Sequence, residues 1–175
     1  MKKFLKRLKL IDYLTTELKI SKARFVAKLT SVTDEGNTGE FSNPFEAFSS
    51  GNNEFKGHIT YDGFKIKRRR KFFDTNINIA VATGSFSEEN ENLKIETEIN
   101  GFNRFFIPFY IILIIFYSIF FLGLSKSNTN SVFFVFPFLI LHASIMFGIP
   151  YLMMRRSVKR LKYELEREFY YLTKE

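Results

Sequence analysis

Few residues in this chain of 175 could carry catalytic or metal chemistry, since it has no Cys and only two His. Without a thiol there is no disulfide, no thiolate metal site and no cysteine nucleophile. His58 and His142 are too few for a multi-His metal site within one chain. There is no P-loop and no HExxH motif, and Gly84-Ser85 lies outside any GxSxG frame. The sequence therefore predicts a non-enzymatic protein without catalytic residues, metal or cofactor.

His142 is the one ionisable residue of the stretch 132–154. An ionisable side chain inside a membrane helix is costly to bury, so it is by default a functional hypothesis. In a helical hairpin, Tyr117 and Ser118 would lie at about the same depth. Two interpretations stay open. Either a neutral imidazole makes a structural hydrogen bond to Tyr117 or Ser118, or His142 serves a proton or ion pathway.

A run of basic residues, KIKRRRK, occupies positions 65–71. Successive side chains of a strand point to opposite faces, so a β-hairpin here would gather its basic residues on one face. One interpretation is a solvated face with ion pairs to Glu96 and Glu98. The other is contact with lipid headgroups or an acidic partner, carried by five residues: Lys56, Lys65, Lys67, Arg69 and Lys71.

Turn and alternation signals predict an α+β domain over 13–104, an antiparallel sheet with one helix. Residues 13–20 alternate as a half-buried strand, and Ser21 is a good N-cap for a helix that ends near Asp34. The dipeptide Asp62-Gly63 suits a two-residue type I′ turn, which would pair Ile59 with Ile66. A second hairpin is predicted from the strands 76–86 and 92–101.

The first twelve residues form a basic amphipathic stretch, 1–12, with Phe4, Leu5, Leu8 and Ile11 at helical intervals. It could lie as an interfacial helix on the inner leaflet. Alternatively it packs its apolar side on the domain that follows.

Two apolar stretches, 105–124 and 132–154, are each long enough to cross a membrane, which takes about 20 helical residues. The polar connection 125–131 is so short that it predicts an antiparallel transmembrane hairpin. Ser144 and Gly148 form a small-xxx-small pair that permits close helix approach.

The segment 155–175 is predicted to be a cytoplasmic amphipathic helix with an apolar stripe. Arg104 and the basic residues after 154 flank the spans, whereas the connecting loop carries only Lys126. By the positive-inside rule the loop is external, and both termini are cytoplasmic at the inner (plasma) membrane. The net charge of +8, much of it beside the spans, favours attraction to anionic lipid over nucleic-acid binding.

The pattern Phe55-x-Gly57-x-Ile59 followed by Phe64-x-Ile66-x-Arg68, ahead of two membrane helices, resembles that of small bacterial membrane proteins. The resemblance implies a cytoplasmic α+β domain on a two-helix anchor. It implies no activity and no functional residue.

Together these patterns predict a binding or scaffolding module at the inner leaflet, with anionic lipid or a protein as partner, that self-associates or acts as a small subunit. The alternative is a channel or transport component, in which several hairpins assemble and His142 lies in the pathway.

Overall fold

The structure is a computed structural model that describes residues 1–39, 53–69, 78–89, 92–126 and 129–174. The chain divides into two compact units, each described by itself below. The sheet domain comprises Met1–Phe102 and Met154–Glu175, and the helical hairpin comprises Asn103–Met153.

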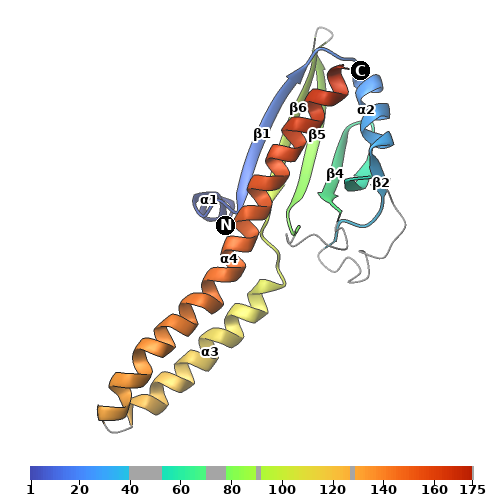
Figure 1. Ribbon diagram of the computed structural model, residues 1–175. Helices are drawn as coiled ribbons and strands as arrows, with labels where there is room; N and C mark the ends of the chain where they lie inside the picture. The colour runs from blue at the N-terminus through green and yellow to red at the C-terminus, as the bar shows by residue number, and fades with distance from the viewer. Residues whose placement is uncertain (40–52, 70–77, 90–91, 127–128, 175) are drawn as a thin grey trace. The chain divides into compact units, whose positions relative to one another are not determined.

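The sheet domain is α+β and contains a six-stranded sheet of order β1-β6-β5-β4-β3-β2 (Figure 1). Its elements along the chain are α1 (Lys2–Arg7), β1 (Ile11–Leu18), α2 (Lys22–Ser31), β2 (Thr33–Glu35), β3 (Phe55–Ile59), β4 (Gly63–Arg68), β5 (Val81–Glu89) and β6 (Asn92–Asn100). The predicted strand at 13–20 is confirmed as β1, and the second hairpin is confirmed as β5 with β6, although its first two predicted residues, 76 and 77, lie outside the described residues.

The sheet is mixed, so the prediction of an antiparallel sheet is wrong at one edge. β2 pairs parallel with β3, with Thr33 opposite Phe55. α2 ends at Ser31, earlier than predicted. Along the chain it connects β1, at one edge of the sheet, to β2, at the other edge. A parallel neighbour needs a connection long enough to return to the same end of the sheet. Residues 36–54 supply that length, although 40–52 lie outside the described residues.

The hairpin of β3 and β4 has a different register from the predicted one. Ile59 lies opposite Phe64, and the Thr60 N–H donates to the Gly63 carbonyl, which leaves Tyr61 and Asp62 as the turn. No described glycine has a positive φ, so Asp62-Gly63 does not form the type I′ turn. The observed register differs from the predicted one by two residues, so each side chain stays on the face of the sheet that was predicted for it.

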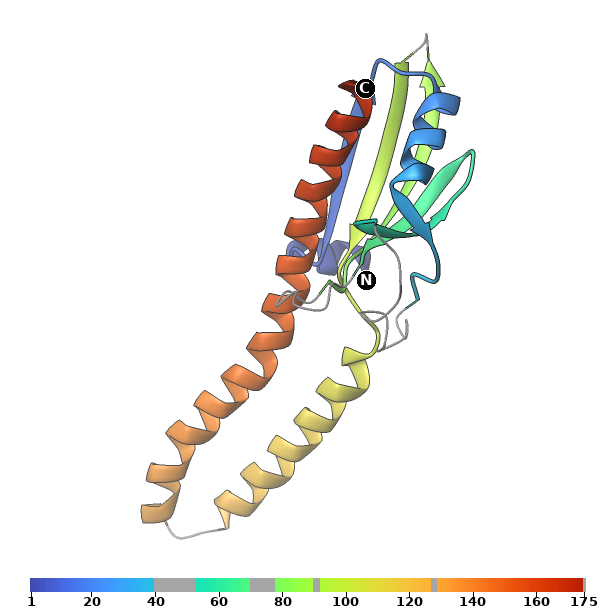
Figure 2. The ribbon, with the colours of Figure 1, turned by 45° about the vertical axis from the view of Figure 1, so that its right-hand side comes forward.

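One face of the sheet is covered by α2 and by the end of α4 (Thr129–Lys174), as Figure 2 shows. Four phenylalanine rings meet there, one each from α2, β4, β5 and α4. The ring centroids of Phe25 and Phe169 are 5.4 Å apart, and those of Phe64 and Phe86 are 5.5 Å apart. Gly84 makes room for this cluster, because a Cβ on it would lie 2.3 Å from the Phe64 ring.

The apolar stripe predicted for the C-terminal helix is buried against this face. It comprises Val158, Leu161, Leu165, Phe169 and Leu172. The other face of the sheet is polar, as the alternation of β6 illustrates: Leu93, Ile95 and Ile99 are fully buried, whereas Lys94, Glu96 and Glu98 are partly or fully exposed.

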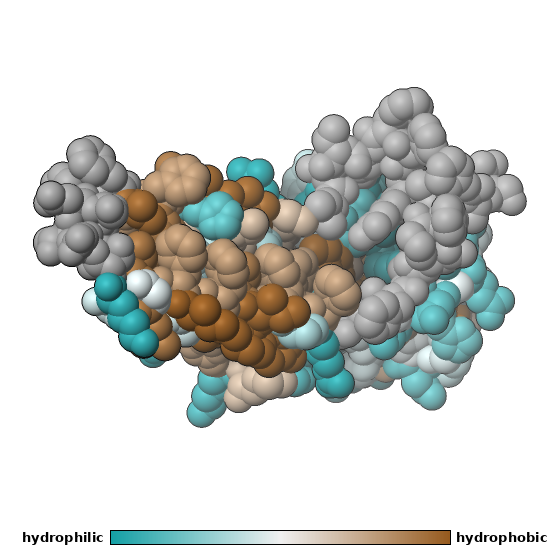
Figure 3. Space-filling view, turned by 90° about the horizontal axis from the view of Figure 1, so that it is seen from below, coloured by the Kyte–Doolittle hydropathy of each residue, from teal (hydrophilic) through white to brown (hydrophobic). Residues whose placement is uncertain are grey.

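The hairpin unit consists of α3 (Phe106–Ser125) and the first part of α4. α4 continues through Pro137 and Pro150 and onward through the predicted C-terminal helix. Both helices are long and apolar enough to cross a membrane, and only 6% and 0% of the residues in their most apolar windows are buried. Figure 3 shows apolar side chains gathered on the molecular surface. The exposed ones of α3 include Ile111, Ile112, Ile115, Ile119 and Leu122.

Candidate functional site

The predicted basic patch is not a continuous exposed surface. Lys65 is exposed on β4 and Lys56 is half-buried on β3, but Lys67 and Arg69 are each only 6% exposed. Arg69 forms an ion pair with Asp34 of β2. Lys71 lies outside the described residues. Among the described members of this group, burial of Lys67 and Arg69 leaves Lys65 as the one fully exposed cation.

The acidic residues expected to compensate this strand have other partners. Glu98 accepts a hydrogen bond from Lys2 at 2.8 Å, and Glu96 lies 2.8 Å from Lys94 on its own strand. The reason is topological, because β5 separates β6 from β4. Neighbouring strands lie about 4.8 Å apart, so β6 and β4 are roughly 10 Å apart.

A buried ionic group lies where β4 meets α4, and the sequence analysis missed it. The Glu164 carboxylate lies 2.8 Å from the Arg68 guanidinium and 2.9 Å from that of Arg160. Burial raises the pKa of Glu164, although Arg160 acts to lower it. Glu164 lies beside Leu161 and Leu165 on the face of the helix that carries the apolar stripe, and this position could have indicated its burial.

Ser157 is a second buried polar residue of α4 that the sequence analysis missed. Its hydroxyl oxygen accepts hydrogen bonds from the backbone N–H groups of Ile79 and Ala80, at 2.9 and 2.8 Å. A buried backbone N–H without a partner is costly. Ser157 therefore fixes α4 to the residues that lead into β5.

The polar residues predicted inside the hairpin do come together in part. The Tyr117 hydroxyl and Nδ1 of His142 are 2.8 Å apart. Ser118 instead donates to the Ile114 carbonyl of its own helix, at 2.7 Å. His142 thus has a hydrogen-bond partner within the hairpin, as expected if its role is to make a structural hydrogen bond.

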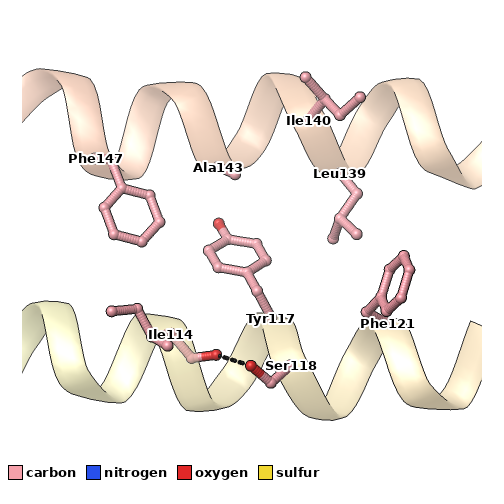
Figure 4. A pocket seen from close by; sticks show the side chains of 8 residues that line it. All are labelled: Ile114, Tyr117, Ser118, Phe121, Leu139, Ile140, Ala143 and Phe147. Atoms are coloured by element: carbon pink, nitrogen blue, oxygen red, sulfur yellow. Dashed lines mark hydrogen bonds between the residues drawn. The ribbon is translucent and has the colours of Figure 1, made fainter.

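An apolar groove of about 430 Å³ lies between the two hairpin helices (Figure 4). Tyr117 and Phe147 point into it from opposite helices. The hydroxyls of Tyr117 and Ser118 are its polar side-chain groups. The lining is Ile114, Tyr117, Ser118, Phe121, Leu139, Ile140, Ala143 and Phe147.

The predicted small-residue pair makes no helix contact within the described part of the chain. Ser144 is exposed and donates to the Ile140 carbonyl of its own helix at 2.8 Å. A Cβ on Gly148 would meet nothing within 4 Å. Close approach at these positions would have to come from another helix.

The described residues contain no group of three or more His, Asp or Glu side chains that could hold a metal ion. Comparisons with protein-family models, with curated proteins and with solved structures find no match for this chain. Its function is therefore argued from its own residues.

Proposed function

We propose that this protein is a membrane-anchored binding or scaffolding module, not an enzyme. In this proposal the hairpin inserts in the inner membrane and the sheet domain works at the cytoplasmic surface. The observation that carries it is a contrast between the two units. The sheet domain buries its apolar side chains in a core of its own, whereas hardly any described apolar side chain of the hairpin is buried: most are exposed and the others are half-buried.

Exposure of this kind points to lipid as the solvent of the hairpin. An apolar helix in a water-soluble protein is expected to bury its side chains, and a helix that is apolar on all sides suits a membrane. The groove between the helices is lined mostly by apolar side chains and would suit an acyl chain or a neighbouring helix.

The orientation rests on the positive-inside rule. Arg155, Arg156 and Lys159 follow the second apolar stretch, whereas Lys126 is the sole basic residue of the connecting loop. Cytoplasmic flanks are enriched in Lys and Arg, which supports cytoplasmic placement of both termini.

The hydrogen bond between Tyr117 and His142 supports a structural role for the histidine. A side chain that serves a proton or ion pathway would face a water-filled cavity. A transport function built on several hairpins therefore remains the alternative proposal, and this contact does not favour it.

Membrane extraction tests the anchor. The full chain, expressed in bacteria, is expected to remain in the membrane pellet after alkaline carbonate and to float with lipid in a density gradient. A variant with Ile115→Asp and Ile145→Asp, one change in each hairpin helix, is expected to lose integration, because a charge at the bilayer centre costs about 3 kcal/mol.

The matched control is Thr83→Asp with Ser85→Asp, two exposed positions of β5, which should float like the unaltered chain. Release of the unaltered chain into the carbonate supernatant as a folded protein would contradict the proposal.

A further inference from the structure

α1 is a short basic helix that is fixed firmly to the sheet domain. It ends in a Schellman motif, in which the Leu10 N–H donates to the Leu5 carbonyl and the Lys9 N–H donates to the Lys6 carbonyl, both at 2.9 Å. Leu5 and Leu10 are buried, which supplies the apolar contact typical of the motif. Ile11, expected in the same helix, is already the first residue of β1.

Lys9 is the one described non-glycine residue with a positive φ, 57°. Glycine is the usual residue at this left-handed position, since a side chain there is disfavoured. Lys9 is exposed. A residue kept in a strained conformation is a reason to look for function, and the property that lysine adds here is a positive charge facing solvent.

The cations of α1 divide between two sides of the helix. On the sheet side, Lys2 bonds to Glu98 and the Lys6 ammonium lies 5.2 Å from the centre of the Tyr13 ring. Lys3 and Arg7 are one turn apart, opposite the buried Leu5, and both are exposed.

Two apolar side chains are exposed beside these cations. Met1 is 88% and Phe4 is 62% exposed. Exposed apolar residues next to Lys and Arg are the composition of helices that lie in a membrane interface.

α4 adds further cations at the same end of the sheet domain. Arg155, Arg156 and Lys159 are exposed on α4. Gly101 lies between this part of α4 and the residues that follow α1. Its N–H donates to the Leu10 carbonyl at 2.9 Å, and a Cβ on it would lie 2.5 Å from Val158. Figures 1 and 2 show α1 beside the start of β1, where β6 ends.

Two described acidic residues at this end, Asp12 and Glu98, already have cationic partners. Asp12 accepts a hydrogen bond from Lys162 at 2.9 Å, and Glu98 accepts one from Lys2 at 2.8 Å. The segments 1–12 and 154–162 together carry ten basic residues and one acidic residue. A surplus of positive charge therefore faces solvent here.

Chain connectivity identifies this as the end of the domain that is joined to the hairpin. The chain leaves the domain at Phe102 and returns at Met154. Three residues, 103–105, precede α3, and an extended chain spans at most about 3.5 Å per residue. If the hairpin spans the bilayer, as proposed above, chain reach keeps Phe102 within roughly 10–15 Å of the first residue of α3.

We propose that the exposed side of α1 and the first turns of α4 after Met154 form a lipid-binding surface for anionic phospholipid headgroups. Its cations are Lys3, Arg7, Lys9, Arg155, Arg156 and Lys159, and its apolar anchors are Met1 and Phe4. This inference rests on the proposed membrane anchor. The proposed lipid contact lies away from the predicted basic patch on β4 and the residue after it, where Lys67 and Arg69 are buried.

The test uses the full chain in lipid nanodiscs with Phe4→Trp as reporter, since the sequence has no other Trp. Discs of phosphatidylcholine are compared with discs that contain phosphatidylglycerol, each with and without brominated acyl chains. We expect bromolipid quenching of the indole fluorescence at position 4 in the anionic discs and much less in the zwitterionic ones. High salt should reduce it, because the screening length falls from about 10 Å at 0.1 M to about 3 Å at 1 M.

Charge reversal identifies the cations. Each basic residue near an anionic leaflet strengthens contact about fivefold, so Lys3→Glu with Arg7→Glu should weaken it at least about 25-fold. The matched control, Lys19→Glu with Lys65→Glu, removes the same charge from exposed positions outside the proposed surface and should quench like the parent.

Lys9→Gly separates a role in folding from a role in binding. It relieves the left-handed strain, so we expect slower amide exchange in the α1 and β1 peptides together with weaker quenching. Unchanged quenching in this variant, in the presence of slower exchange, would remove Lys9 from the surface.

Equal quenching in both kinds of disc, or no quenching in either, would overturn the lipid surface while leaving the anchor intact. Failure of the chain to enter discs or to resist carbonate would instead count against the proposed function itself.

Discussion

Single polar residues decide how the C-terminal helix is held on the sheet. Ser157 is buried and accepts two backbone N–H groups. At the other end of the helix, Lys28 of α2 donates to the Leu172 carbonyl at 2.9 Å, where a helix end has carbonyls without an intrahelical partner. These contacts fix the helix at two separate points on the domain.

We expect Ser157→Ala to destabilise the sheet domain by about 1–3 kcal/mol, because it removes the acceptor of the buried Ala80 N–H and of the half-buried Ile79 N–H. Hydrogen exchange of the full chain in detergent should show faster exchange at these two amides and across β5. Ser85→Ala, at an exposed position of the same strand, is the control and should exchange like the parent. Equal protection in Ser157→Ala would show that the hydroxyl is dispensable.

At the scale of elements, Asp12 ties the edge strand β1 to α4. Its carboxylate accepts hydrogen bonds from Lys162 at 2.9 Å and from the Tyr13 N–H at 2.8 Å. The bond from the Tyr13 N–H leaves this backbone group of the edge strand unable to pair with a strand of another molecule, which protects the edge of the sheet. Burial acts to raise the pKa of Asp12, but these hydrogen bonds together with the charges of Lys162 and Lys6 outweigh it and hold the pKa below its usual value of 3.8.

This lowered pKa gives a pH-dependent stability. The ionised carboxylate stabilises the folded domain fully at pH values above 3.8, and this contribution is lost as the pH falls through the lowered pKa. Asp12→Asn should therefore have a lower unfolding temperature than the parent at neutral pH, and this difference should shrink as the pH falls below 3.8. Thermal unfolding of the full chain in detergent across this range measures the effect, with the exposed Glu166→Gln as control. A difference that is constant with pH would contradict the assignment.

The elements that sequence could predict are those whose signal is local. The alternation of Leu93, Ile95 and Ile99 predicted β6, and the spacing of Leu161, Leu165 and Phe169 predicted the buried helix stripe. Equal depth in a hairpin of two apolar helices predicted that His142 could meet Tyr117 or Ser118, and the structure pairs it with Tyr117. For β6 and for the helix stripe, the periodicity of the element alone determines which side chains share a face.

The features that sequence could not predict depend on distant residues. β2 has three residues and no periodicity, so its parallel pairing arises from the connections around it. The turn signal of Asp62-Gly63 is overridden where the Phe86 N–H donates to the Asp62 carbonyl at 3.0 Å. Arg69 was expected on an exposed face, but Asp34, far along the chain, permits its burial.

At the scale of the whole molecule, the chain combines two units with opposite requirements. The sheet domain has a core built from residues on both sides of the hairpin in sequence, since α4 returns the chain to it. The hairpin has exposed apolar helices that suit a membrane. The proposed membrane anchor explains this contrast between the two units. It also gives the cationic end of the sheet domain its proposed partner, the lipid headgroups.

The most direct test of this account is cysteine accessibility from the two sides of the membrane, for which the chain is suited because it contains no Cys. Two single-cysteine variants of the full chain are compared, Asn128→Cys in the hairpin connection and Thr83→Cys at an exposed position of β5. With a membrane-impermeant maleimide on intact spheroplasts, we predict labelling at position 128, and labelling at position 83 only after permeabilisation. Labelling of both positions, or of position 83 alone, in intact spheroplasts would contradict the account.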